Sequence, residues 1–505
     1  MKETQTTDTL AVIDRVVTAE AHQPYPEYLE AAASDNLSTA RRYAIILLIL
    51  MCNLIQFVSM FSTVAGGFEF SSQLGHEAEP GEANWMAAAF SLTQSAFVLI
   101  TGRLGAVYGH TSLLLLGVVI MAVFSLCNAF CDTYISFVVM RALTGIAGGI
   151  IMPNSVATLT IMIPPGKARN ATLATFSATP PLGALIGALS AGAFLEYAEW
   201  KWHFILIACV SVVACTGLFI VLPREEAVDK GGKIDYVGAF FGVSGLLLFN
   251  IAWNQAPSSG WQSPYLIVLL ILSILFILAF FVWESKFASS PIMPLSVFTA
   301  PSFNALLFVV LFIYMAVGIS LWYMVAWQQL IRGWKVLHIA VGWIPYGIAA
   351  SVAVTLAAWL IVILEAQYIL LLGCLTSIVA CVLLATMPEQ QTYWAQIFPA
   401  TLVGGLCPDF VYVAAQLIAS DSVGKKEQGI ASSLIGTLNL YGNSLGLGFA
   451  GMIESQISKN TGDKVTGFRA ALWFGAGLGF ASLFLDLLFV RMKSNHRLGK
   501  SERRQ

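Results

Sequence analysis

The chain has 505 residues, of which 57% are hydrophobic and only 11% are charged. Soluble domains usually carry about a quarter charged residues, so this composition excludes a water-soluble enzyme. The formal net charge is −2, which leaves no basic surface for nucleic acid, because binding there requires many phosphates to be neutralised. Apolar stretches recur at the length of about 20 residues that crosses a bilayer. The sequence therefore predicts an all-α polytopic membrane protein.

Fourteen membrane spans are predicted. They are expected near residues 43–66, 84–104, 112–131, 134–158, 171–195, 203–222, 234–254, 264–283, 303–328, 338–363, 367–387, 394–419, 429–452 and 470–490. An even number of spans places both termini on one side of the membrane. Most of the 26 Lys and Arg residues lie in the tails or in loops on that side, and such residues are retained in the cytosol, so both termini are predicted to be cytosolic.

Two stretches of the chain share an order of features. The pair Gly148–Gly149 precedes Pro153 in predicted span 4, and the pair Gly404–Gly405 precedes Pro408 in predicted span 12. A short basic loop and a helix rich in small residues follow each. If the stretches are repeats, spans 1–6 and 9–14 form two parallel halves, which is the architecture of major facilitator transporters. Chance similarity is the alternative, since Gly and Pro are common in membrane helices.

The predicted organisation follows from this repeat. It comprises a cytosolic tail at 1–42, a six-helix bundle at 43–222, an inserted helix pair at 223–290, a second six-helix bundle at 291–490 and a basic cytosolic tail at 491–505.

The loop after predicted span 2 contains Gly102, Arg103 and Gly109, and its glycines permit tight turns and close helix approach. The stretch 102–111 resembles the loop motif of the major facilitator superfamily, in the form found in fourteen-span drug:proton antiporters of the fungal aminotriazole-resistance and secondary-metabolite efflux type. In that family an Asp and basic residues clamp the cytosolic side shut. Ala106 occupies the Asp position here, so we expect a latch based on packing rather than on charge.

Predicted span 4 carries Arg141 in a segment similar to the arginine-containing segment of the same family. A guanidinium stays charged and is costly in an apolar helix, so we expect it to face a polar cavity or a partner. The resemblance implies that Arg141 couples proton movement to substrate. The alternative is that the side chain extends to the outer interface.

Predicted span 5 contains Pro180, Gly183 and Gly187. The segment resembles the antiporter motif that marks exporters in the family. Proline bends a helix and small residues allow intimate packing, so this helix can seal and flex one face of a cavity. The alternative is a kinked helix with no bearing on transport direction.

Asp409 follows Pro408 in the middle of predicted span 12. A carboxylate near the bilayer centre is costly unless it faces water, a cation or another polar group. We interpret Asp409 as the second proton-coupling residue, and it resembles a feature of the aminotriazole-type subgroup. The alternative is a structural carboxylate that accepts hydrogen bonds from backbone amides freed by Pro408.

Polar and aromatic residues at depth are candidates for lining a substrate cavity between the halves, because an apolar pocket with a few hydrogen-bonding groups suits an amphipathic ligand. They are Asn53, Gln56, Gln94, Trp322, Tyr323, Trp327, Gln416, Asn439 and Asn443.

The resemblance implies a proton-coupled secondary transporter that exports small amphipathic or toxic organic compounds, resides as a monomer in the plasma or vacuolar membrane, and has protons and an organic substrate as its ligands. A Walker-type loop is absent from the sequence, so ATP is not its direct energy source. The eight cysteines lack CxxC spacing, and neither a metal nor a cofactor is expected. An importer or siderophore-type carrier and a non-transporting sensor remain alternatives. A membrane-embedded enzyme is disfavoured, because the six histidines lie in tails, loops or span ends.

Overall fold

The computed structural model describes residues 38–76, 83–164, 166–223, 227–289, 291–300, 302–424 and 427–491. All regular secondary structure in these ranges is helical. Most of the predicted tails at 1–42 and 491–505 lie outside the described residues.

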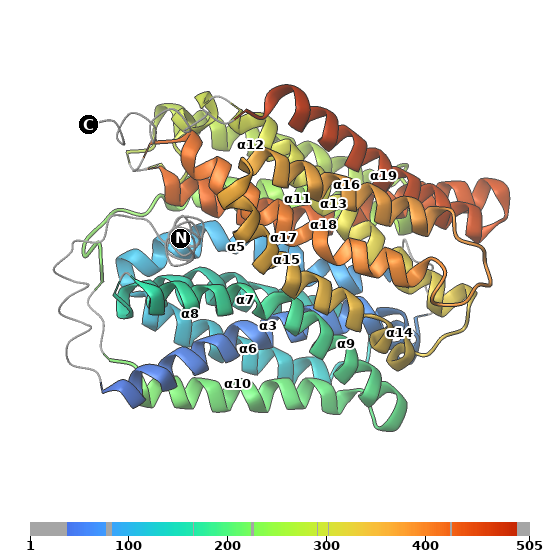
Figure 1. Ribbon diagram of the computed structural model, residues 1–505, viewed down its shortest axis with the longest axis horizontal. Helices are drawn as coiled ribbons and strands as arrows, with labels where there is room; N and C mark the ends of the chain where they lie inside the picture. Colours follow the sequence, from blue (N-terminus) through green and yellow to red (C-terminus); the bar gives the residue numbers. More distant parts are fainter. Residues whose placement is uncertain are drawn as a thin grey trace.

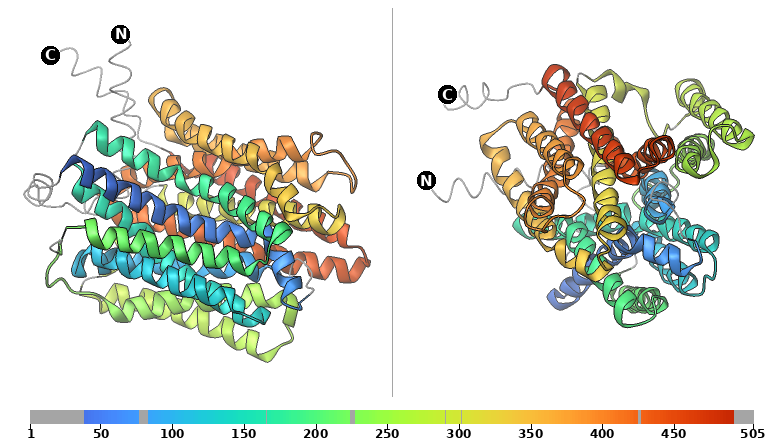
Figure 2. Two further views of the ribbon diagram at one scale, coloured as in Figure 1. Left: turned by 90° about the horizontal axis from the view of Figure 1, so that it is seen from below. Right: turned by 90° about the vertical axis from the view of Figure 1, so that its right-hand side faces the viewer.

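The first group of helices comprises α3 (Thr39–Gln73), α5 (Trp85–Tyr108), α6 (His110–Ala129), α7 (Tyr134–Met162), α8 (Lys167–Ser177), α9 (Thr179–Tyr197) and α10 (Lys201–Val221). These helices pack on one another, and we call them the N-terminal bundle. The pair α11 (Tyr236–Ser259) and α12 (Pro264–Lys286) follows. Figure 2 (right) shows this pair at the side of the molecule, beyond α18 and α5.

The last group contains a short 3₁₀ helix, η1 (Leu295–Thr299), and the helices that we call the C-terminal bundle. These are α13 (Phe303–Ala326), its π-helical extension η2 (Trp327–Ile331), α14 (Val336–Gly342), α15 (Ile344–Ile363), α16 (Ala366–Ala385), α17 (Ile397–Ser422), α18 (Gln428–Thr461) and α19 (Lys464–Phe489). The long helices of both bundles run side by side along one direction (Figure 1).

Thirteen of the fourteen predicted spans coincide with helical segments that are long and apolar enough to cross a membrane. The remaining one, predicted at 429–452, forms the long helix α18 but does not pass the same test of hydropathy. Its sequence is rich in Gly, Ser and Asn, and the helix is packed against α5, α11, α13, α17 and α19. A helix enclosed by other helices does not need the apolar surface that lipid requires.

Two predicted spans are broken near proline. The span predicted at 171–195 divides into α8 and α9 at Ala178, two residues before Pro180, and the span predicted at 338–363 divides into α14 and α15 at Trp343, just before Pro345. Proline has no N–H to donate and its ring clashes with the preceding turn, so a continuous helix is interrupted. For the fifth span we expected a bend at the proline, and the structure has a break between α8 and α9 there.

The glycines of α9 bring it into close contact with α3. A Cβ atom on Gly183 would lie 2.5 Å from the Cβ of Phe57, and one on Gly187 would lie 2.5 Å from the backbone oxygen of Val58. Any larger residue at Gly187 would therefore push the two backbones apart.

Each bundle starts and ends at the same end of the helix array, and we call this end the terminal face. Near the start of α3, the Arg41 side chain donates a hydrogen bond to the backbone oxygen of Val221 at the end of α10 (2.7 Å). Near the start of α13, the Ser302 hydroxyl accepts a hydrogen bond from the backbone N–H of Arg491 after α19 (3.1 Å). The other end of the array is the opposite face.

Candidate functional site: a cavity between the bundles

A cavity of about 620 Å³ lies between the N-terminal and C-terminal bundles. We call it the central cavity. Its wall is mostly apolar and aromatic, with a few polar groups, as in sites for amphipathic ligands. Among its lining residues are Asn53, Phe57, Phe61, Phe176, Pro180, Tyr314, Tyr346, Trp359, Asp409, Tyr412, Gln416, Asn439 and Asn443.

The central cavity lies toward the terminal face. On the N-terminal side it is lined by residues 174–184, from the end of α8 and the start of α9, and on the C-terminal side by residues 346–361 of α15 and 408–416 of α17. Helix α8 starts, and α15 and α17 end, at the terminal face, so the cavity extends from the middle of the bundles toward that face. The two bundles are separated there by the cavity.

The opposite face is closed by contacts between the bundles. The ring of Trp322 stacks on Phe68 with centroids 4.5 Å apart, and a Cβ atom on Gly192 would lie 2.6 Å from the Cα of Leu337. Nearer the surface, Lys335 Nζ lies 3.0 Å from Glu196 Oε1. The structure is therefore a conformation closed at the opposite face, with its cavity toward the terminal face.

Asp409 is the one charged side chain that the described residues contribute to the lining of the central cavity. It follows Pro408 inside α17. No hydrogen bond or ion pair to its carboxylate is present among the described residues, so the alternative of a carboxylate held by backbone amides has no support in these contacts. An unpaired carboxylate in an apolar wall is costly until a proton or a cation neutralises it.

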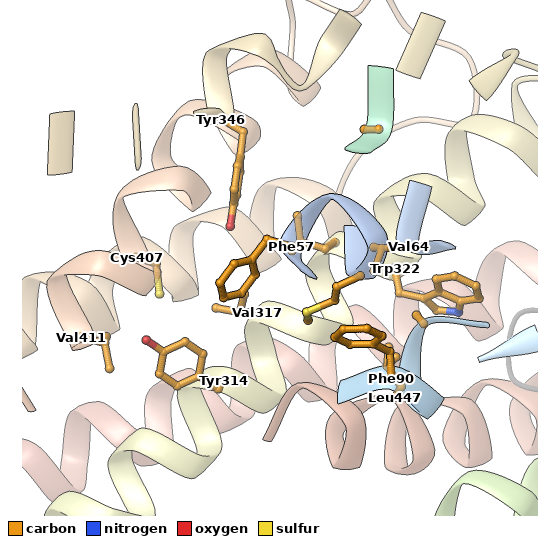
Figure 3. Packing of buried hydrophobic residues seen from close by; sticks show 14 of the residues in the cluster. Phe57, Val64, Phe90, Tyr314, Val317, Trp322, Tyr346, Cys407, Val411 and Leu447 are labelled. Atoms are coloured by element: carbon orange, nitrogen blue, oxygen red, sulfur yellow. The ribbon is translucent and has the colours of Figure 1, made fainter. Parts of the chain in front are cut away.

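Two buried tyrosines flank this part of the wall. The hydroxyl of Tyr314 donates a hydrogen bond to the backbone oxygen of Pro408 (2.8 Å), which occupies the hydroxyl proton and fixes α13 against α17. Figure 3 shows Tyr314 beside Cys407 and the hydroxyl of Tyr346 directed toward Phe57. Aromatic faces next to a carboxylate provide the environment in which organic cations bind well.

A chain of amide side chains leads from the cavity wall into the N-terminal bundle. Asn53 lines the cavity and donates a hydrogen bond to Thr179 Oγ1 (2.5 Å). Gln56 donates to Asn53, and Gln94 donates to Gln56 Oε1 (3.2 Å). Of these side chains, Asn53 lines the central cavity, and Gln56 and Gln94 lie buried behind it.

Several predicted cavity residues are placed elsewhere. Gln56 and Gln94 are buried in the amide chain behind Asn53. Trp322 packs in the closure of the opposite face, and Tyr323 and Trp327 lie inside the C-terminal bundle, both against Phe468. Their predicted place on the central cavity is wrong, because each faces a neighbouring helix. Asn53, Gln416, Asn439 and Asn443 do line it.

Arg141 is fully buried within the N-terminal bundle and does not line the central cavity. Its two terminal nitrogens donate to the hydroxyl and to the backbone oxygen of Ser59, each at 2.7 Å. The guanidinium carbon lies 4.9 Å from the ring centre of Phe90. Among the described residues, its surroundings are neither a polar cavity nor an exposed interface. Its contacts join α7 to α3.

The loop motif carries a charged contact that the sequence did not predict. Arg103 Nη1 lies 2.7 Å from Asp229 Oδ2, and the backbone N–H of Asp229 donates to the oxygen of Ala106 (2.9 Å). The expectation of a latch without charge is thus wrong, because the segment before α11 supplies the carboxylate. Gly109 makes the turn with φ of +99°, while a Cβ atom on Gly102 would lie 3.8 Å from the Cβ of Pro153, an ordinary van der Waals distance.

The sequence analysis also missed the aromatic residues of the cavity wall. The aromatic residues Tyr314, Tyr346 and Trp359 line the cavity, yet nothing in one sequence distinguishes them from the many aromatics at the membrane interfaces. A period of four residues along α15, from Tyr346 to Ala350, Val354 and Ala358, is the signal that could have identified a cavity face.

The sequence of the chain is similar to transporters. The family described as Major Facilitator Superfamily matches residues 46–447 and, in a second match, 340–505. An uncharacterized MFS-type transporter of Schizosaccharomyces pombe is 36% identical over 81% of this chain and 80% of its own length. A low affinity ammonium transporter of Saccharomyces cerevisiae is 32% identical, with 84% of both chains covered. The efflux pump terJ of Aspergillus terreus is 29% identical, over 94% of this chain and 95% of its own.

Solved structures show the same fold at low sequence identity. A POT family peptide transporter covers 90% of this chain and 98% of its own with a TM-score of 0.65 at 15% identity. A bacterial homolog of the lysosomal transporter Spinster covers 91% of this chain and 100% of its own, with a TM-score of 0.63 at 14% identity. With a family match over most of its length and two relatives above 30% identity, the chain belongs to the Major Facilitator Superfamily.

Proposed function

We propose that the protein is a proton-coupled exporter of small amphipathic organic cations. The observation that carries the proposal is the carboxylate of Asp409, which has no hydrogen-bond or ion-pair partner among the described residues and lines an apolar and aromatic cavity between the bundles. Within the part of the chain that the structure describes, no basic side chain lines this cavity, so its field favours positive ligands.

The proposed coupling is competition for one carboxylate. A cation bound near Asp409 neutralises the carboxylate and contacts aromatic faces such as that of Tyr346. After the bundles rock and the cavity faces the other side, a proton replaces the cation. The protonated carboxyl is neutral, so the empty carrier returns without an uncompensated charge in the apolar wall.

Arg141 receives an indirect role in this proposal. Because its guanidinium is bound to Ser59 of α3 rather than exposed to the cavity, it positions the helix that carries Asn53 and does not itself carry the proton. This replaces the sequence-based interpretation of Arg141 as a direct coupling residue.

The proposal also includes the direction of transport and the orientation of the protein in the membrane. The fungal relative named an efflux pump supports export, and the relative named an ammonium transporter supports a cationic substrate. Helices of this length and apolarity place the protein in a membrane. Basic residues near the terminal face support cytosolic termini, so the observed cavity would face the cytosol. We further propose a monomer in the plasma membrane.

The test is transport of tetraphenylphosphonium by purified protein in liposomes with an imposed pH gradient. We expect uphill movement of the probe against a proton flux for the native protein. We expect Asp409→Asn to lower the gradient-driven rate at least about tenfold, a loss of roughly 1.4 kcal/mol or more in transition-state stabilisation. Asp132→Asn, at an exposed acid outside the cavity, is the matched control. Full gradient-driven flux in Asp409→Asn would refute the proposal. Movement of the probe in the same direction as the protons would indicate an importer.

A further inference from the structure

A second hollow of about 680 Å³ lies between α9 and α15, on the outer side of the bundles. We call it the lateral groove. Its wall includes Leu182, Ile348 and Val352, whose side chains are 43%, 57% and 51% exposed. Large apolar side chains that are exposed on a membrane helix face lipid. The lateral groove therefore opens to the hydrocarbon of the bilayer.

Helix α15 presents one face to the central cavity and the next face to the lateral groove. Residues four apart lie on one stripe of a helix. The cavity stripe consists of Tyr346, Ala350, Val354 and Ala358, and the groove stripe of Ile348, Val352 and Leu356. Thr355 and Trp359 line both hollows. On α15, these two side chains stand between the groove and the cavity.

Helix α9 shows the same division. Pro181 and Ala184 line the central cavity, while Leu182 and Leu185 line the lateral groove. The two helices touch where a Cβ atom on Gly347 would lie 3.3 Å from Leu185 Cδ2. From this contact toward the terminal face, each helix lines both hollows with different side chains: Leu182 and Val352 line the lateral groove, while Pro181 and Val354 line the central cavity. The contact between α9 and α15 is therefore the seam between lipid and cavity.

Trp359 is the side chain best placed to control passage across this seam. It is 53% exposed although it also lines the central cavity. The described residues that line the groove include no charged one, and the hydroxyl of Ser351 donates a hydrogen bond to the backbone oxygen of Gly347 (2.8 Å). An apolar or aromatic moiety can lie there, while the first charged partner along the route is Asp409.

We propose that the lateral groove is an access site through which an amphipathic organic cation, dissolved in the leaflet next to the terminal face, reaches the central cavity past Trp359. The proposal rests on the proposed function, since it concerns the same substrate. Continuity with the cavity through Thr355 and Trp359 favours the substrate over a permanently bound lipid as the occupant. Partition into lipid raises the local concentration of an apolar cation, so access from the bilayer lowers its apparent KM.

The first test fills the groove without touching the cavity lining. In the liposome assay with tetraphenylphosphonium, Ser351→Trp is compared with Val379→Trp, which adds the same side chain to the exposed face of α16. We expect KM to rise about fivefold or more in Ser351→Trp, with kcat within about twofold of native. This pattern indicates weaker substrate binding rather than slower turnover. An unchanged KM, or an equal effect in Val379→Trp, would overturn the proposal.

The second test does not depend on transport. It measures whether a cation occupies the lateral groove even if the native protein shows no gradient-driven flux. A diazirine-bearing alkylammonium is dissolved in the bilayer and activated by light. We expect adducts in the peptides that contain Leu182 and Ser351–Trp359, lost on addition of tetraphenylphosphonium and reduced in Ser351→Trp. Labelling of these peptides by a diazirine phospholipid that tetraphenylphosphonium does not displace would show a lipid-only groove. Absence of adducts would also overturn the proposal.

Discussion

The guanidinium of Arg103 lies 2.7 Å from the carboxylate of Asp229, so an ion pair joins the end of α5 to the segment that leads into the inserted helix pair. The loop motif thus finds its carboxylate more than a hundred residues away in the chain, in place of the local Asp that Ala106 replaces. Tyr108 and Tyr236 add a hydroxyl–hydroxyl contact of 2.8 Å to the same junction.

This pair is predicted to behave as a unit. We expect Arg103→Ala and Asp229→Ala to destabilise the protein by a similar small amount, and the double variant to lose no more than either one, with a coupling energy of about 0.2–1 kcal/mol because the pair is partly exposed. Thermal unfolding in detergent at low and high salt measures it. The exposed pair Lys201–Asp132, with 3.6 Å between its charges, is the control. Additive losses at Arg103 and Asp229 would contradict the coupling.

The close packing of α9 on α3 is predicted to tolerate no added methyl group. Gly187→Ala would bring Cβ to 2.5 Å from the backbone oxygen of Val58, so we expect a loss of about 1–3 kcal/mol in unfolding free energy. Gly477→Ala on α19 is the matched control, because nothing lies within 4 Å of the new Cβ there. Equal stability of the two variants would show that the α3–α9 contact can relax.

Arg141 and Ser59 provide a test that separates a positioning role from a proton-carrying one. Ser59→Ala removes a hydrogen-bond acceptor of a fully buried guanidinium, and we expect a loss of roughly 1–3 kcal/mol. Adding Arg141→Met should recover part of that loss, since the buried charge is removed together with its partner. In flux measurements we expect the double variant to keep the native ratio of protons to substrate. A changed ratio would place Arg141 in the proton path.

The closure of the opposite face is predicted to open during every transport cycle. Lys335 and Glu196 meet there at 3.0 Å. We expect Glu196→Cys and Lys335→Cys, joined by a short bis-methanethiosulfonate, to hold this face shut and to reduce flux to the background of empty liposomes. Reduction of the linker should restore the rate. The two single-cysteine variants, treated identically, control for modification of native thiols. Undiminished flux in the linked protein would argue against alternating access at this face.

Much of the fold could be predicted from the sequence, because span length and apolarity are properties of single segments. The spans and the proline interruption at Pro180 were visible in local patterns. Helix α18 illustrates the limit of apolarity alone: its glycines and asparagines suit a helix enclosed by others, and it falls short of the hydropathy expected of a lipid-facing span.

The site was only partly predictable, because residue type does not reveal which side of a helix faces a cavity. Asp409 and Asn53 were identified by polarity at depth and do line the cavity. Gln94 and Trp327 share that polarity or size but point into their own bundles. The Ser59 contact of Arg141 and the Asp229 contact of Arg103 depend on tertiary packing between distant segments, and no local pattern specifies them.

The central claim is that a proton and an organic cation compete for the carboxylate of Asp409, and proton release on substrate binding tests it most directly. Purified protein in weakly buffered detergent solution is mixed with tetraphenylphosphonium while a pH indicator records the change. The account predicts that binding releases protons in proportion to the bound cation, and that Asp409→Asn releases none. Undiminished binding without proton release in the native protein, or equal release from Asp409→Asn, would contradict it.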